Sequence, residues 1–190
     1  PNNIEYIYNL AQFQYNNQRY DEAITSLDRI ERLMGKNEFL SMEKHSIFIQ
    51  KKDYKSAEKE LNKLIDAYPA NWDYQVYLGD FYMQRNRLKE ALVQYEDVIK
   101  NDPDNGKAFF SLANYYLMVG DSVEFRSYLK KGFSSSALDF DSKFQRVVPF
   151  LMNIDQEGNP LNEQDFEDIF SAVIQSHPQE SKVYLLYANY

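Results

Sequence analysis

The sequence is organised by a unit of 34 residues that recurs along the chain, and its clearest copy runs from Trp72 to Asn105. The first half of this unit places aromatic and aliphatic residues at helical spacing, and the second half does so again after a break at Asn86. Asp102 and Pro103 are turn residues that close the unit. Two short amphipathic helices cannot bury both apolar stripes alone, so neighbouring units must cover them. The unit therefore predicts an array of stacked helix pairs.

Shifting the unit by 34 residues reproduces its small and apolar positions. Ala91 in the second helix corresponds to Ala57 one unit earlier and to Ala23 one unit before that. Small residues at this place permit close approach of paired helices. Three copies therefore share one frame over residues 4–105.

The fourth and fifth copies depart from this frame. In residues 106–139, Phe125 replaces the small Ala and Gly132 replaces an apolar closing residue, so we expect looser or shifted packing. The fifth copy has a first helix around Ser142–Met152 and a second around Gln164–Ser176, joined by a long loop over residues 153–163. Pro149 within the first of these helices predicts a kink. We expect this irregular copy to be either a specialised surface or a diverged unit that tolerates irregularity.

Both ends of the sequence also fit the frame. Residues 1–3 match the closing turn of an earlier unit, and residues 181–190 begin a further unit or cap the fifth one. We therefore expect the chain to be a piece of a longer array.

These motifs resemble the tetratricopeptide repeat, with QRYDEAI at Gln18–Ile24 and NRLKEAL at Asn86–Leu92 as its most typical pieces. The resemblance implies an all-α fold, a right-handed α-α superhelix (solenoid) of antiparallel helix pairs with about 11 helices. It also implies one array over residues 1–190, with repeats at 4–37, 38–71, 72–105 and 106–139, an irregular repeat at 140–180 and a partial or capping helix at 181–190.

The resemblance further implies where a ligand binds, because in this family the first helices line the concave face of the superhelix. The positions that face inward are mapped onto this sequence as Tyr8, Gln12, Tyr15, Met42, Ser46, Ile49, Val76, Asp80, Met83, Phe110, Asn114 and Leu117, continued in the fifth repeat by Gln145, Pro149 and Met152. Such a lining suits an extended peptide or a helix with apolar anchors. The competing interpretation is ordinary packing between neighbouring helices. The basic clamp with which some members bind carboxylate tails is absent from these positions.

Neither catalysis nor a cofactor is expected. The only histidines are His45, at a tight place between helices where we expect a packed and hydrogen-bonded ring, and His177, which we expect to be exposed in a turn. Carboxylates such as Glu58 and Glu60 are interpreted as solvated helix faces. No phosphate loop, zinc helix or nucleophile elbow is present. We therefore predict a non-enzymatic scaffold that binds a protein or peptide, with a self-assembling segment or a regulatory module of a larger enzyme as alternatives.

Charge and composition exclude several partner classes. The net charge of -8 disfavours nucleic acid and anionic lipid surfaces, which need clustered Lys and Arg. No apolar run reaches membrane-spanning length, so no membrane insertion is expected. Seven of the 29 acidic residues lie in residues 147–181, which contain no Lys or Arg, and the charges of the rest of the chain are nearly balanced.

The resemblance includes long bacterial envelope arrays, which favours an extracytoplasmic location over a cytoplasmic one.

No metal site is expected either. Residues 153–158 place oxygen ligands at alternate positions before Gly158, as in a calcium loop, but Gln164 stands where that loop needs a bidentate Glu. We therefore interpret the segment as a solvated loop. The absence of Cys excludes disulfides and thiolate metal sites.

Overall fold

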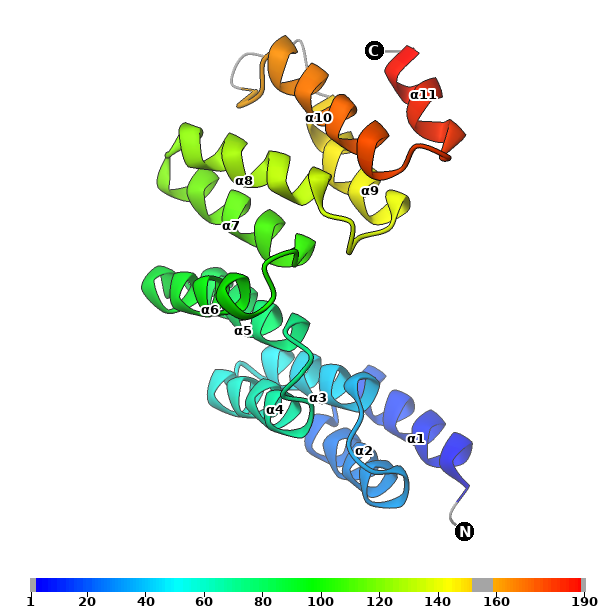
Figure 1. The fold of residues 1–190 in the computed structure, drawn as a ribbon. Coiled ribbons are helices and arrows are strands. Elements are labelled where there is room, and N and C mark those ends of the chain that lie inside the picture. Colours follow the sequence, from blue (N-terminus) through cyan, green and yellow to red (C-terminus); the bar gives the residue numbers. More distant parts are fainter. Residues whose placement is uncertain (1–2, 152–158, 189–190) are drawn as a thin grey trace. The chain divides into compact units, whose positions relative to one another are not determined.

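The structure, a computed structural model, describes residues 3–151 and 159–188. All the regular secondary structure of these residues is α-helical, in eleven helices, as the repeat pattern predicts. The chain divides into two compact units, Pro1–Phe81 (unit 1) and Tyr82–Tyr190 (unit 2), which are described separately. Figure 1 labels the helices: α1 Ile4–Asn16, α2 Tyr20–Met34, α3 Glu38–Gln50, α4 Tyr54–Ala67, α5 Asp73–Gln84, α6 Leu88–Asn101, α7 Gly106–Val119, α8 Ser122–Ser134, α9 Phe140–Leu151, α10 Glu163–Ser176 and α11 Ser181–Ala188.

The same tight turn joins the two helices of each of the first four pairs. Its central residue adopts a left-handed conformation at Gln18, Lys52, Asn86 and Gly120, with φ of 60°, 60°, 57° and 82°. In every case the next residue donates its backbone N–H to the carbonyl five residues earlier, as Arg19 does to Gln14 at 2.8 Å. This arrangement satisfies carbonyls that a helix end leaves unpaired. The 34-residue period of the sequence is therefore a period of backbone geometry.

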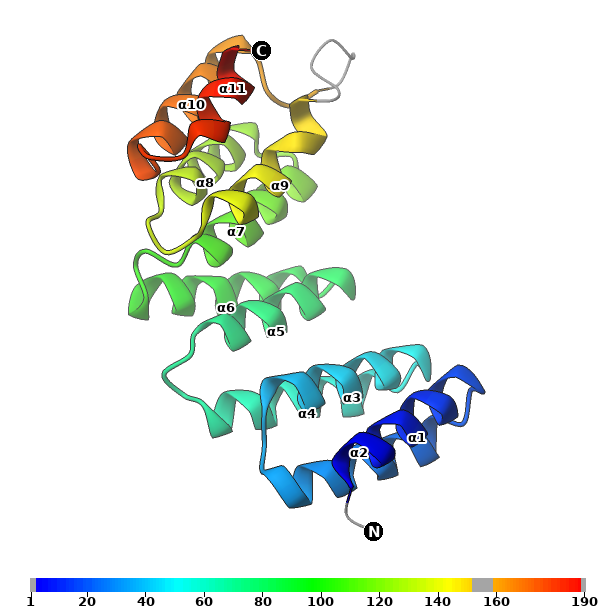
Figure 2. The same cartoon turned by 90° about the vertical axis from the view of Figure 1, so that its right-hand side faces the viewer.

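Unit 1 places two helix pairs side by side, α1 with α2 and α3 with α4 (Figure 2). The small residues Ala23 and Ala57 are fully buried at the predicted contacts between paired helices. The His45 ring donates through Nδ1 to the carbonyl of Ala57 at 3.0 Å and meets the Phe81 ring edge-on. Burial lowers the pKa of His45 more than this hydrogen bond raises it. The predicted packed and hydrogen-bonded role of His45 is confirmed.

A buried ionic network ties α2, α3 and α4 together. The Lys44 ammonium is 1% exposed and lies 3.0 Å from Asp28, 2.7 Å from Glu31 and 3.1 Å from Glu60. Glu60 is itself 2% exposed and is also paired with Lys36 and Lys63. Burial opposes the charge of Glu60, but these cations hold its pKa down at about 2. The interpretation of Glu60 as part of a solvated face is therefore wrong.

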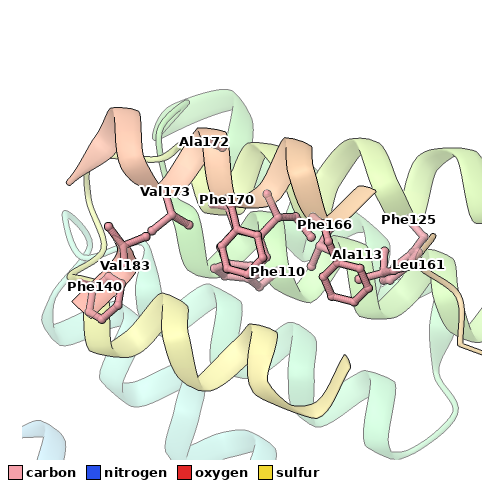
Figure 3. Packing of buried hydrophobic residues seen from close by; sticks show 13 residues of the cluster. Phe110, Ala113, Phe125, Phe140, Leu161, Phe166, Phe170, Ala172, Val173 and Val183 are labelled. Atoms are coloured by element: carbon pink, nitrogen blue, oxygen red, sulfur yellow. The ribbon is translucent and has the colours of Figure 1, made fainter. Parts of the chain in front are cut away.

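In unit 2, side chains from α7, α8, α9, α10 and α11 meet in one aromatic core (Figure 3). Phe125 is fully buried there, so the departure from a small residue does not loosen the packing. The larger volume of Phe125 is compensated by the missing side chain of Gly132. A Cβ added at Gly132 would come within 2.9 Å of the Phe110 ring. The missing side chain of Gly132 thus leaves room for that ring, and the close contact between α7 and α8 has shifted along the helix.

The α9–α10 pair contains a second buried lysine. Lys143 is 0% exposed, and its ammonium donates to the Ser176 hydroxyl at 2.8 Å. Burial lowers the pKa of Lys143 to about 8, although the negative charges of Asp104 and Asp139 act to raise it. His177, expected to be exposed, is partly buried against Phe140, because this turn folds back onto the core.

Helix α9 continues through Pro149 to Leu151, and the segment of residues 152–158, which holds the calcium-like sequence, lies outside the described residues. In the described part of the chain, none of the helices is long and apolar enough to cross a membrane.

Candidate functional site

The twelve mapped positions are divided between the units, eight in unit 1 and four in unit 2. The six on α1 and α3 are all solvent-accessible: Tyr8, Gln12, Tyr15, Met42, Ser46 and Ile49. Asp80 and Met83 of α5 are partly buried, and Asn114 and Leu117 of α7 are exposed. Val76 and Phe110 instead lie in the core, so their side chains are not available to a ligand in this structure.

The structure brings together the side chains of α1 and α3. Gln12 donates from Nε2 to the Tyr8 hydroxyl at 2.9 Å and to Oε2 of Glu43 at 2.9 Å. The rings of Tyr8 and Phe39 lie beside each other, with centroids 5.4 Å apart. Glu5 is exposed three residues before Tyr8, on the same helical stripe. We call this set the α1–α3 surface, and it consists of Glu5, Tyr8, Gln12, Phe39, Met42 and Glu43.

Two members of the α1–α3 surface, Phe39 and Glu43, are absent from the mapped positions. Phe39 is 55% exposed although it is a large apolar residue, and Glu43 holds the amide of Gln12. Residues 39 and 43 lie one turn apart on α3, which is the helical spacing that could have identified them as a pair. Their contact with α1 depends on how far the two helices are rotated, which the period alone does not fix.

The electrostatic environment of the α1–α3 surface is negative. Burial raises the pKa of the Tyr8 hydroxyl, and the charge of Glu43 raises it further against the hydrogen bond from Gln12. The surface holds no group of nucleophile and base, and what it presents is aromatic area, one amide and two carboxylates. Such an arrangement can bind a ligand by contact and by charge.

The acidic segment in unit 2 is partly neutralised by its neighbours. Lys130 of α8 donates to Asp168 at 2.8 Å, and Arg126 lies 3.7 Å from Asp165. Glu167 accepts a hydrogen bond from the Tyr187 hydroxyl at 2.6 Å. Among the residues that the structure describes there is no cluster of three metal-ligating side chains. Three of the described carboxylates of this segment, Asp165, Glu167 and Asp168, therefore contact side chains of α8 or α11.

Comparison with known families gives two matches. Residues 4–33 and residues 48–114 each match a family model described as tetratricopeptide repeat. A curated relative, Tetratricopeptide repeat protein 37 of Xenopus laevis, is 36% identical over 93 residues, which is 45% of this chain and 6% of that protein. The chain therefore corresponds to a small part of the length of this relative.

Solved structures show the same fold. The chain is similar to the crystal structure of MamA with a TM-score of 0.53 and 22% identity, over 76% of this chain and 82% of that chain. It is also similar to TTC0263, a thermophilic tetratricopeptide repeat protein of Thermus thermophilus, with a TM-score of 0.52 and 13% identity, over 98% of this chain and 97% of that chain. At these identities the likeness shows the fold and nothing finer.

Proposed function

The chain belongs to the tetratricopeptide repeat family, and from this premise we propose that it is a non-enzymatic scaffold whose α1–α3 surface binds a peptide or a segment of a partner protein. The family fold supports a role in protein interaction in general. The assignment of binding to the α1–α3 surface is part of the proposal, and the side chains that support it all belong to unit 1.

The observation that carries the proposal is the accessibility of Phe39. Phe39 is 55% exposed, and its ring lies beside Tyr8 instead of entering the core of unit 1. An aromatic side chain held in place by a neighbouring ring is a typical anchor of protein interfaces, because it presents a large contact area at a small loss of rotamer freedom. Met42 adds an adaptable apolar contact on the same helix. Gln12 supplies an amide oxygen to which a peptide backbone N–H can donate.

A binding screen with a matched control tests the proposal. The full chain is screened against a peptide array, and every captured peptide is then measured with Phe39→Ser and Phe13→Ser. Phe13 of α1 is equally exposed at 57% but lies outside the α1–α3 surface. We expect Phe39→Ser to weaken binding about fivefold or more, as loss of an aromatic anchor does. We expect Phe13→Ser to leave binding unchanged.

Circular dichroism of both variants checks that they keep the helical fold. Equal capture of every peptide by the two folded variants would contradict binding at this surface.

A further inference from the structure

The charges of α1 and α3 are segregated by sign. Their acidic residues, Glu5, Glu38 and Glu43, are all solvent-accessible. The only Lys or Arg of the two helices is Lys44, which is 1% exposed and is held by carboxylates of α2 and α4. The accessible charges of these helices are therefore all negative.

The second helices of the same unit differ. Helix α2 carries Arg29 and Arg32 among its acidic residues, and α4 carries three lysines, Lys55, Lys59 and Lys63. The uniform sign on α1 and α3 is thus a property of one layer of unit 1 and not of the unit as a whole.

The α1–α3 surface combines two neighbouring aromatic rings with carboxylates. Phe39 and Tyr8 are in ring contact, and Tyr8 is joined through Gln12 to Glu43. Glu38, next to Phe39, accepts a hydrogen bond from the Tyr74 hydroxyl at 3.1 Å, so its carboxylate is also held in place. A guanidinium group fits both features, because it stacks on ring faces and donates in a fork to carboxylates.

We propose that the α1–α3 surface selects a cationic peptide segment that contains arginine and an apolar side chain. The guanidinium of arginine stacks on the rings of Tyr8 and Phe39 and pairs with one carboxylate of the surface, Glu5 or Glu43. The apolar side chain contacts Met42. This inference rests on the proposed function and adds the chemistry of the partner to it.

Charge complementarity argues against other occupants. Nucleic acid and acidic peptides would meet like charges on this surface. A second copy of the same surface would do the same, because a two-fold contact places identical patches opposite each other. A cationic segment is the occupant whose charge the surface complements.

The test uses the full chain and two short labelled peptides, one of alternating arginine and leucine and one of alternating glutamate and leucine. Fluorescence polarisation measures their affinity at low and at physiological ionic strength. We expect the arginine peptide to bind, with an affinity that falls as salt is added, and the glutamate peptide not to bind.

Charge-neutralising variants then locate the binding. We expect Glu5→Gln combined with Glu43→Gln to weaken binding of the arginine peptide roughly three- to tenfold and to reduce its salt dependence. The control is Asp66→Asn, which removes an exposed carboxylate from α4 and should leave the affinity unchanged.

The inference is overturned if the glutamate peptide binds as tightly as the arginine peptide, or if the double variant binds the arginine peptide as wild type does. A neutral peptide whose capture depends on Phe39 but not on Glu5 and Glu43 would overturn it while the proposed function stands. If Phe39→Ser leaves the binding of every captured peptide unchanged, the proposed function itself is wrong.

Discussion

Two lysines with almost no exposed surface behave in opposite ways, and the difference lies in their partners. Burial alone would lower the pKa of Lys44, but hydrogen bonds to Glu31 and Asp28 and the charge of Glu60 raise it above the ordinary value. Lys143 donates to the neutral hydroxyl of Ser176, so burial prevails and its pKa falls to about 8. Lys44 is therefore a structural cation, whereas the charge on Lys143 costs stability.

This cost predicts a pH dependence for Lys143→Met. The pKa of Lys143 is lower in the folded chain, about 8, than the roughly 10.4 of an unfolded lysine. Below pH 8 both states bind the proton and the penalty is fully present, and it disappears as the pH rises toward 10. We expect Lys143→Met to raise the free energy of unfolding by about 1 to 3 kcal/mol at pH 7 and by much less at pH 10. Urea unfolding at both pH values measures this.

Lys182→Met is the control, since Lys182 forms an ion pair with Asp141 that is 62% and 69% exposed. Surface pairs of this kind contribute little, so we expect a change below about 0.5 kcal/mol. A gain at Lys143 that stays constant from pH 7 to pH 10 would show that its charge is not the cause.

The environment of some residues could be predicted from the sequence, and that of others could not. The role of His45 followed from its place in the frame and is confirmed. The burial of Glu60 could not be predicted, because its partner Lys44 comes from α3 and the two meet only after three helices have packed. Val76 and Phe110 occupy mapped inward positions but are buried, since a small rotation of a helix decides which edge of a stripe its neighbours cover.

At the scale of the element, the period predicted the helices well. The starts of α2, α4, α6 and α8 fall at the same place in successive repeats. The conformation of the turns was harder to predict from the sequence. Gln18, Lys52 and Asn86 are not glycines, and a left-handed backbone is uncommon for them. Only the repetition of the hydrogen bonds from turn to turn shows that the geometry is imposed by the helix pair.

These turns predict that substitutions from glycine and to glycine have opposite effects on stability. Gly120→Ala places a Cβ on a residue with φ of 82° and should lower the free energy of unfolding by about 1 kcal/mol, although no atom lies within 4 Å to clash with it. Gln18→Gly removes such strain and should raise the free energy of unfolding by up to about 1 kcal/mol. Asn86→Gly should gain less, since Asn tolerates this conformation better. Thermal unfolding gives all three, and a loss at Gln18→Gly would contradict the strain argument.

At the scale of the whole molecule, the division into two compact units separates two kinds of core. Unit 1 combines an aliphatic core with the ionic network around Lys44 and Glu60, and unit 2 has an aromatic core. In a repeat array each element depends mainly on its neighbours, so damage in one region need not spread to another. The sequence predicted one continuous array, and its pattern did not indicate these different interiors.

Replacing Lys44 tests this local dependence. Lys44→Met leaves the buried carboxylate of Glu60 without its buried partner and should cost about 3 to 5 kcal/mol in unit 1. Hydrogen exchange should then become faster in α2, α3 and α4, and change far less in α8 and α10. Uniformly faster exchange in all helices would show that the two units unfold as one.

The recurring left-handed turn also bears on how such a chain can change its length. Removing residues 53–86 would connect Lys52 directly to Arg87, and the new junction would again have a left-handed residue followed by the start of a second helix. Duplication of the same stretch would likewise place the same left-handed turn at the new junction. The turn is thus a position at which a whole repeat can be removed or added while the same backbone geometry is kept at the junction.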